Sequence, residues 1–91
     1  MTERITHVEQ SQRFEMIVDG HTCLLEYSSV PSGVRFDSVR VPEAVGGRGL
    51  AGTLTRWALD WARSKDLKVQ PACPYVAAWI QRHPDYADVL A

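Results

Sequence analysis

Residues 41–52 form a glycine-rich stretch, Val-Pro-Glu-Ala-Val-Gly-Gly-Arg-Gly-Leu-Ala-Gly, whose residue types suit phosphate binding. A strand-like run ends at Pro42, and an amphipathic pattern begins near Arg48. Where a helix begins, its first backbone N–H groups are unpaired and lie at the positive end of the helix dipole. Glycine lets a ligand approach the backbone closely and adopts positive φ at little cost. The stretch therefore predicts a phosphate or pyrophosphate site, with a purely structural turn as the alternative.

This stretch matches neither of the two commonest phosphate-binding motifs. No Lys-Ser or Lys-Thr pair follows the glycines, which argues against the P-loop of nucleotide triphosphatases. Gly47, Gly49 and Gly52 have the dinucleotide-binding spacing, but Asp66, the acidic residue in the right range, lies before the next strand rather than at its end. Neither class of nucleotide-binding protein is therefore predicted.

Cys73 is the second residue whose position could carry chemistry. Pro74 suits the first turn of a helix, so Cys73 would stand at the N-cap, where the helix dipole favours a thiolate. The alternative is a small buried cysteine without reactivity, as we expect for Cys23 in mid-strand. Neither the two cysteines nor the histidines have metal-ligand spacing, so no metal is expected. Free thiols are typical of a reduced, cytoplasmic protein.

Length and charge narrow the class of protein. Ninety-one residues predict one domain, residues 1–91, with a small core. Ten basic and eleven acidic residues give a formal charge of −1, which is not the basic field that nucleic-acid binding needs. No apolar run has the length of a membrane span, and the N-terminus lacks the apolar segment of a signal peptide. Neither nucleic acid nor membrane is therefore expected as a partner.

The elements that must position these residues follow from the hydrophobic periodicity. A short or frayed edge strand is expected within residues 4–10, and alternation predicts strands at 13–19, 22–28 and 34–41. Asp19-Gly20 and residues 31–33 are turn signals. The apolar parity changes between Phe36 and Val39, which predicts either a bulge near Asp37-Ser38 or burial of both faces.

Residues 48–64 show the 3.6-residue period of an amphipathic helix, in which Trp57 and Trp61 are expected as core anchors. A short strand at 67–70 should lie parallel to the strand before the helix, through a right-handed crossover. A second helix should begin at Pro74 and end at His83-Pro84, with a last helical turn in 85–90. The predicted fold is α+β: about three antiparallel strands, a helix, a parallel fourth strand and a C-terminal helix, with a single layer of helix on the sheet.

Together these segments resemble the GNAT-type N-acetyltransferase superfamily, and most closely its small stand-alone members. The likeness rests on residues 41–51 and on Pro-Ala-Cys-Pro-Tyr-Val at 71–76, continuing to 82–86. It implies that the protein transfers acetyl from acetyl-CoA to an unidentified amine, with the pyrophosphate on the amides of the glycine turn. It also implies that the pantetheine arm lies between two splayed strands. The residues so implied are Val39 and Val41 along the arm, Gly46, Gly47, Arg48, Gly49, Leu50, Ala51 and Gly52 around the phosphates, and Cys73 near the acetyl thioester.

Two positions depart from the pattern of the superfamily. Gly46 stands where an Arg or Gln is usual, so a charged contact would have to come from Arg48. Ser38 stands where small relatives often carry a His, three residues before the Val-Pro pair. The chain also has no room for the two N-terminal helices that help larger members to bind their acceptor. A non-catalytic acyl-CoA-binding or partner-binding module is therefore the alternative hypothesis, and the oligomeric state stays open.

Overall fold

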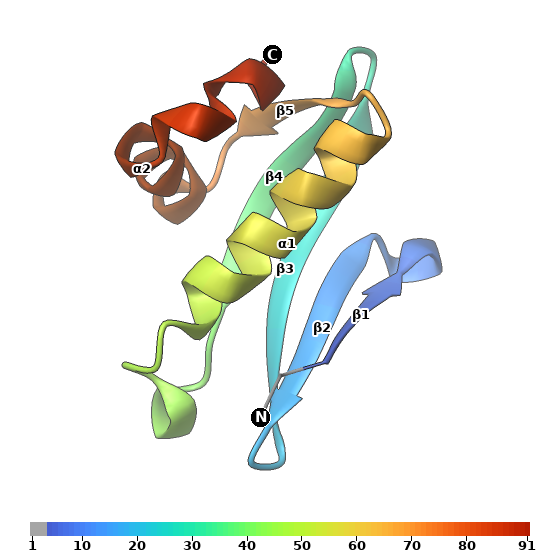
Figure 1. Ribbon diagram of the computed structural model, residues 1–91. Coiled ribbons are helices and arrows are strands. Elements are labelled where there is room, and N and C mark those ends of the chain that lie inside the picture. The colour runs from blue at the N-terminus through green and yellow to red at the C-terminus, as the bar shows by residue number, and fades with distance from the viewer. Residues whose placement is uncertain (1–3) are drawn as a thin grey trace.

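A five-stranded sheet in the order β1-β2-β3-β4-β5 is the centre of the computed structural model, which describes residues 4–91 (Figure 1). Its strands are β1 (Ile5–Val8), β2 (Arg13–Val18), β3 (His21–Val30), β4 (Gly33–Arg40) and β5 (Lys68–Pro71). The helices are α1 (Leu50–Ser64) and α2 (Pro74–Arg82), with short 3-10 helices η1 (Glu9–Ser11), η2 (Glu43–Val45) and η3 (Pro84–Val89). Strands β1 to β4 pair antiparallel, and β5 pairs parallel with β4 after α1. The predicted α+β fold is confirmed, as is the parallel pairing of the strands before and after α1.

The antiparallel meander has four strands, because the segment expected as a short or frayed edge forms a paired strand. Strand β1 pairs with β2 along its whole length, from Ile5 opposite Met16 to Val8 opposite Arg13. Its inward-facing positions include His7, whose ring stacks on Phe14 with 4.2 Å between the centroids. A histidine at a core-facing position hides the alternation of apolar residues that would have marked the strand.

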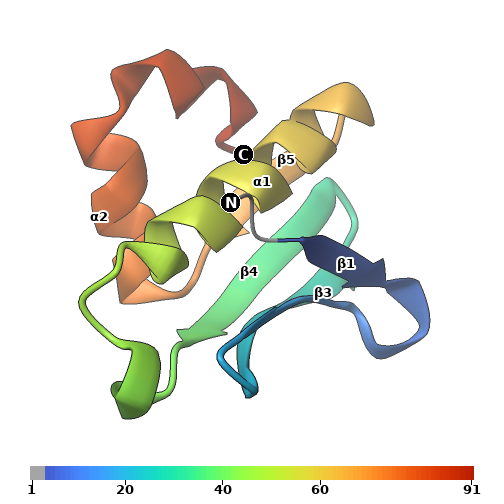
Figure 2. The same cartoon turned by 60° about the horizontal axis from the view of Figure 1, so that its bottom comes forward.

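One face of the sheet carries the core, and both helices lie on that side (Figure 2). The apolar side chains that meet there come from all five strands and both helices, with Ile5 of β1 partly buried at the edge. Those fully buried include Phe14, Met16, Cys23, Leu25, Phe36, Leu54, Leu59, Val69 and Val76. On the opposite face Ile17 is 66% exposed. No helix within residues 4–91 covers that face, which agrees with the predicted single layer of helix on the sheet.

A β-bulge interrupts the pairing of β3 with β4. The register shifts between Glu26, which lies opposite Ser38, and Tyr27, which lies opposite Phe36, so Asp37 is left over. The Asp37 carboxylate accepts hydrogen bonds from Ser28 and Arg35. The bulge lies at the position that the sequence predicted. Because its extra residue reverses which side chains of the strand face inward, Phe36, Val39 and Val41 all contact the core.

Trp57 is not the core anchor that the periodicity predicted. It is 40% exposed and contacts Phe14 only edge-on, with 5.3 Å between the ring centroids. Successive residues of a helix point about 100° apart around its axis. Because Ala58 points directly into the core, the preceding Trp57 side chain lies at the margin of the apolar stripe. Trp61, one turn further on, is partly buried against the core as expected.

Candidate functional site

The glycine turn joins β4 to α1 through η2 and two left-handed glycines. Gly47 has φ of 78° and Gly49 has φ of 74°, a conformation that a right-handed helix cannot contain. Helix α1 therefore begins at Leu50, two residues later than predicted, with Gly49 at the N-cap. Leu50 itself points into the core, where its side chain is 5% exposed.

The backbone N–H groups of residues 47–52 face no acceptor within residues 4–91. The first hydrogen bond of α1 runs from the N–H of Thr53 to the carbonyl of Gly49, over 3.1 Å. A helix ordinarily leaves four N–H groups unpaired and satisfies some of them with an N-cap side chain, which Gly49 lacks. A Cβ added to Gly47 or Gly49 would meet no protein atom within 4 Å, so the space beside these amides is open. Donors without acceptors beside open space fit an anionic group.

Arg48, in the middle of this turn, is directed to the β2–β3 hairpin. Its guanidinium donates to the carboxylate of Asp19 over 2.8 Å, and both side chains are exposed. Exposed ion pairs contribute about 0 to 1 kcal/mol, so this one holds Arg48 only weakly. A phosphate at the turn would compete with Asp19 for the same guanidinium.

Strands β4 and β5 separate beside the start of α2. Their pairing ends with Phe36 opposite Pro71, followed by a hydrogen bond from the Cys73 N–H to the Phe36 carbonyl, over 3.0 Å. Beyond this bond β4 continues to Arg40 and, within the described residues, pairs only with β3, while the chain after Cys73 turns away into α2 (Figure 1). The edge of β4 from Asp37 onward is therefore open toward the gap between the two strands.

Cys73 stands at the N-cap of α2, as the sequence predicted, with a free thiol that is 7% exposed. Two residues further on, Tyr75 reaches the first turn of α1. A Cβ on Gly52 would lie 3.3 Å from the Tyr75 hydroxyl and 3.4 Å from Nε1 of Trp79. The absence of a side chain at Gly52 therefore lets the start of α2 pack beside the glycine turn. Cys23, by contrast, is fully buried in the core.

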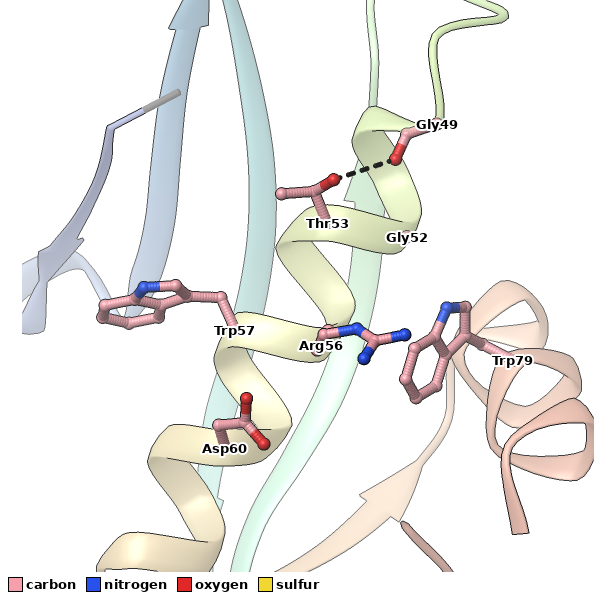
Figure 3. Close-up of a pocket in the computed structure, with 7 residues that line it drawn as sticks. All are labelled: Gly49, Gly52, Thr53, Arg56, Trp57, Asp60 and Trp79. Carbon is pink, nitrogen blue, oxygen red and sulfur yellow. Dashed lines mark hydrogen bonds between the residues drawn. The ribbon is translucent and has the colours of Figure 1, made fainter. Parts of the chain in front are cut away.

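A groove extends from the glycine turn along the outer surface of α1 (Figure 3). It has a volume of about 390 Å³ and is lined by Gly49, Gly52, Thr53, Arg56, Trp57, Asp60 and Trp79. The Arg56 side chain extends toward Trp79, and its guanidinium carbon lies 5.5 Å from the centroid of that ring. The amphipathic pattern of residues 48–64 did not reveal this groove, because only the packing of α2 brings Trp79 there. Gly52 was the one residue in the sequence that could have indicated this close packing, because it is a glycine within a helix of bulkier residues.

On the uncovered face of the sheet, Ser38 donates a hydrogen bond to the Glu26 carboxylate over 3.0 Å. Glu43 is exposed in η2. Within residues 4–91, no three His, Cys, Asp or Glu side chains form a group that could hold a metal ion. None of the described helices is long and apolar enough to cross a membrane.

Comparisons with a family model, with individual proteins and with solved structures all point to the same family. The GCN5-related N-acetyl-transferase family matches residues 13–89. Protein NATD1 of Mus musculus is 31% identical over 84 residues, covering 89% of this chain and 76% of that protein. Protein NATD1 of Danio rerio is 29% identical over 91 residues, covering 93% and 82%. The NMR structure of a GCN5-like protein from Staphylococcus aureus shares the fold, with a TM-score of 0.77 and 22% identity over 97% of this chain and 87% of that one. Because the family match spans most of the sequence, the chain belongs to the GCN5-related N-acetyl-transferase family.

Proposed function

We propose that this protein binds acetyl-CoA between the glycine turn and the opening of β4 from β5, and transfers the acetyl group to an amine. Family membership gives the class of reaction. The observation that supports the cofactor is the run of N–H groups at residues 47–52, which have no acceptor within residues 4–91 and lie beside open space. A pyrophosphate is an anion with many acceptor oxygens, and a helix N-terminus is suited to it.

Different residues would hold the different chemical parts of acetyl-CoA. The amides of 47–52 suit the pyrophosphate, whereas the Gly46 N–H already donates to the Glu43 carbonyl. The Arg48 guanidinium is available once it leaves Asp19. Val39 and Val41, partly buried after the bulge, offer apolar contacts for the pantetheine arm. The open backbone edge of β4 from Asp37 offers unpaired groups for its amides. When bound, acetyl-CoA provides an activated acyl group as a thioester.

We propose further that the acetyl group passes through Cys73. The observation in favour is its position: the thiol is free at the N-cap of α2, and the Cys73 backbone bonds to Phe36 at the point where β4 and β5 separate. In this route the Cys73 thiol loses its proton, forms a thioester with the acetyl group and releases CoA as the free thiol. The amine then takes the acetyl group and Cys73 regains its proton. Direct attack of the amine on acetyl-CoA is the alternative, and it needs a base but no thiol.

An amide-resolved NMR titration of the labelled protein with acetyl-CoA tests the binding site. The amide resonances of residues 46–52 and those around Cys73 should shift together, with a single affinity. If nothing moves at millimolar acetyl-CoA, the glycine turn is only a turn and the proposal is wrong.

Turnover is then measured as release of free CoA thiol in the presence of a panel of primary amines. Thiol release that depends on one class of amine supports acetyl transfer. Binding in the titration with no amine-dependent release at all would instead assign the protein as a non-catalytic acyl-CoA-binding module.

A further inference from the structure

Arg56 is a cation that the fold positions but does not neutralise. It lies on the outer surface of α1, one turn after Gly52, and lines the groove that begins at the glycine turn. The four ion pairs within residues 4–91 involve Arg13, Arg35, Arg48 and Arg63, but not Arg56. Asp60, one turn further along α1, accepts a hydrogen bond from the Tyr86 hydroxyl over 2.9 Å instead. The guanidinium is therefore free for a ligand.

Trp79 fixes the direction of this guanidinium. Its indole is 4% exposed and stacks on the His83 ring, with 3.7 Å between the centroids and 13° between the planes. The His83 ring is in turn held by a 2.7 Å hydrogen bond between its Nδ1 and the Trp79 carbonyl. Arg56 lies against this buried indole, and a guanidinium over an aromatic ring is attracted to it (Figure 3). Such preorganisation lowers the ordering cost of binding.

We propose that Arg56 binds the phosphate on the 3′ position of the CoA ribose, and so makes this protein select CoA over its dephospho form. This inference rests on the proposed function, because it takes the pyrophosphate to lie on the amides of 47–52. Along the groove, Arg56 lies about one helical turn (5.4 Å) beyond Gly52 and about two turns beyond Gly49. The 5′ and 3′ phosphates of a nucleotide are separated by a single sugar ring, so one nucleotide can reach both sites.

The chemistry of the groove agrees with this ligand. A guanidinium can present two parallel N–H donors to a phosphate, and such charge-assisted, bidentate hydrogen bonds are stronger and more specific than neutral ones. The groove volume of about 390 Å³ lies in the range of small-molecule sites. Trp57 lines its other side and is 40% exposed, which leaves apolar surface for a nucleobase.

Calorimetric affinities for CoA and for dephospho-CoA test the proposal. The native protein should bind CoA about tenfold more tightly, the size of one charge-assisted contact. Arg56→Gln should bring this ratio close to one while leaving the affinity for dephospho-CoA unchanged. Arg56→Lys should restore part of the ratio, because it keeps the charge and loses the planar fork. Arg82→Gln, an exposed arginine in the last turn of α2 outside the groove, is the matched control and should keep the native ratio.

The three indole N–H resonances give a second readout in the same titrations. CoA should shift the Trp79 indole signal more than dephospho-CoA does, while Trp61, which lies outside the groove, serves as the internal reference.

Equal affinities of the native protein for the two ligands, with the amides of 47–52 shifting for both, would overturn the role of Arg56 and leave the proposed function intact. An equal loss of affinity for both ligands in Arg56→Gln would also overturn the role of Arg56. If the native protein bound neither CoA nor dephospho-CoA, both the proposed function and the role of Arg56 would be wrong.

Discussion

The backbone N–H of Cys73 donates to the carbonyl of Phe36, and this 3.0 Å bond is the last that joins β4 to the chain after β5 within residues 4–91. Phe36 directly precedes the bulged Asp37, after which the edge of β4 is open. The bond therefore fixes the thiol of Cys73 at the point where the two strands separate. Its position is set by the sheet and not only by the helix that it caps.

Acetylation of Cys73 is the first prediction. Incubated with acetyl-CoA and no amine, the native protein should gain the mass of one acetyl group, since the thioester at Cys73 has no acceptor. Cys73→Ala should abolish both this mass increase and amine-dependent turnover, measured by intact-protein mass spectrometry and CoA thiol release. Cys23→Ala is the control, because Cys23 is fully buried in the core and should leave labelling in place. Full turnover by Cys73→Ala would establish direct attack by the amine instead.

Alanine substitutions at two left-handed glycines separate binding from stability. Gly49→Ala forces a side chain into φ of 74° and should lower the free energy of unfolding by about 1 to 2 kcal/mol. It also places a methyl group in the open space beside the free amides, so the affinity for acetyl-CoA should fall roughly tenfold. Gly20→Ala, at φ of 78° in the β2–β3 hairpin with equally open surroundings, should cost similar stability and leave the affinity unchanged. Urea unfolding and calorimetry measure the two effects, and a parallel loss of affinity in both variants would contradict the phosphate site.

Thr55→Val should raise the stability of the protein. Thr55 is fully buried on α1, and its hydroxyl finds no hydrogen-bond partner in the described part of the chain. Replacing the hydroxyl by a methyl group removes a desolvation penalty of about 1 kcal/mol or more. Thr53→Val on the same helix is the control: its exposed hydroxyl bonds to the Gly49 carbonyl, so no gain is expected there. A lower midpoint of urea unfolding for Thr55→Val would show that the hydroxyl is satisfied in solution.

His7 should make the stability depend on pH. Burial of its ring lowers the pKa of His7, against a smaller raising effect of Glu9, and Lys65 lowers that pKa further. The folded state therefore resists a proton that the unfolded chain accepts near pH 6.5, so the free energy of unfolding falls as pH drops below that value.

Comparison of unfolding at pH 7.5 and pH 5.5 checks this dependence. His7→Gln, which can still bond to the Tyr27 hydroxyl that lies 2.7 Å from the His7 ring, should lose less stability over this interval than the native protein. His21→Gln, an exposed imidazole at the start of β3, should lose as much as the native protein does. An unchanged pH dependence in His7→Gln would show that another group is responsible.

Local signals in the sequence were sufficient for much of this fold. Alternation located β2 and β4, Asp19-Gly20 located the hairpin, and the change of parity after Phe36 located the bulge. The start of α1 was predicted two residues early, because periodicity alone does not reveal that Gly49 is left-handed. The role of Trp57 was wrong for a related reason: a residue at the margin of an apolar stripe has the same spacing as one at its centre.

Features of the site that lie within one segment of the sequence were predicted, whereas the groove, which two helices form together, was not. The glycine turn and the N-cap position of Cys73 each follow from local residue types. The groove depends on α2 packing against α1, where Gly52 admits Tyr75 and Trp79. That contact spans more than twenty residues of sequence, and no period or motif encodes it. Whether the predicted residues bind acetyl-CoA stays a prediction.

Gly49 has one more consequence, for the lifetime of the protein. A helix of fifteen residues usually gains about 1 kcal/mol from an N-cap side chain, and α1 forgoes that contribution. A bound pyrophosphate would provide the missing acceptors, and a ligand at one hundred times its Kd adds about 2.7 kcal/mol to the stability of the folded state. Proteases degrade the unfolded state, so the folded population in a cell would follow the concentration of acetyl-CoA. If acetyl-CoA binds at this turn, its binding would also link the abundance of the protein to the metabolic state of the cell.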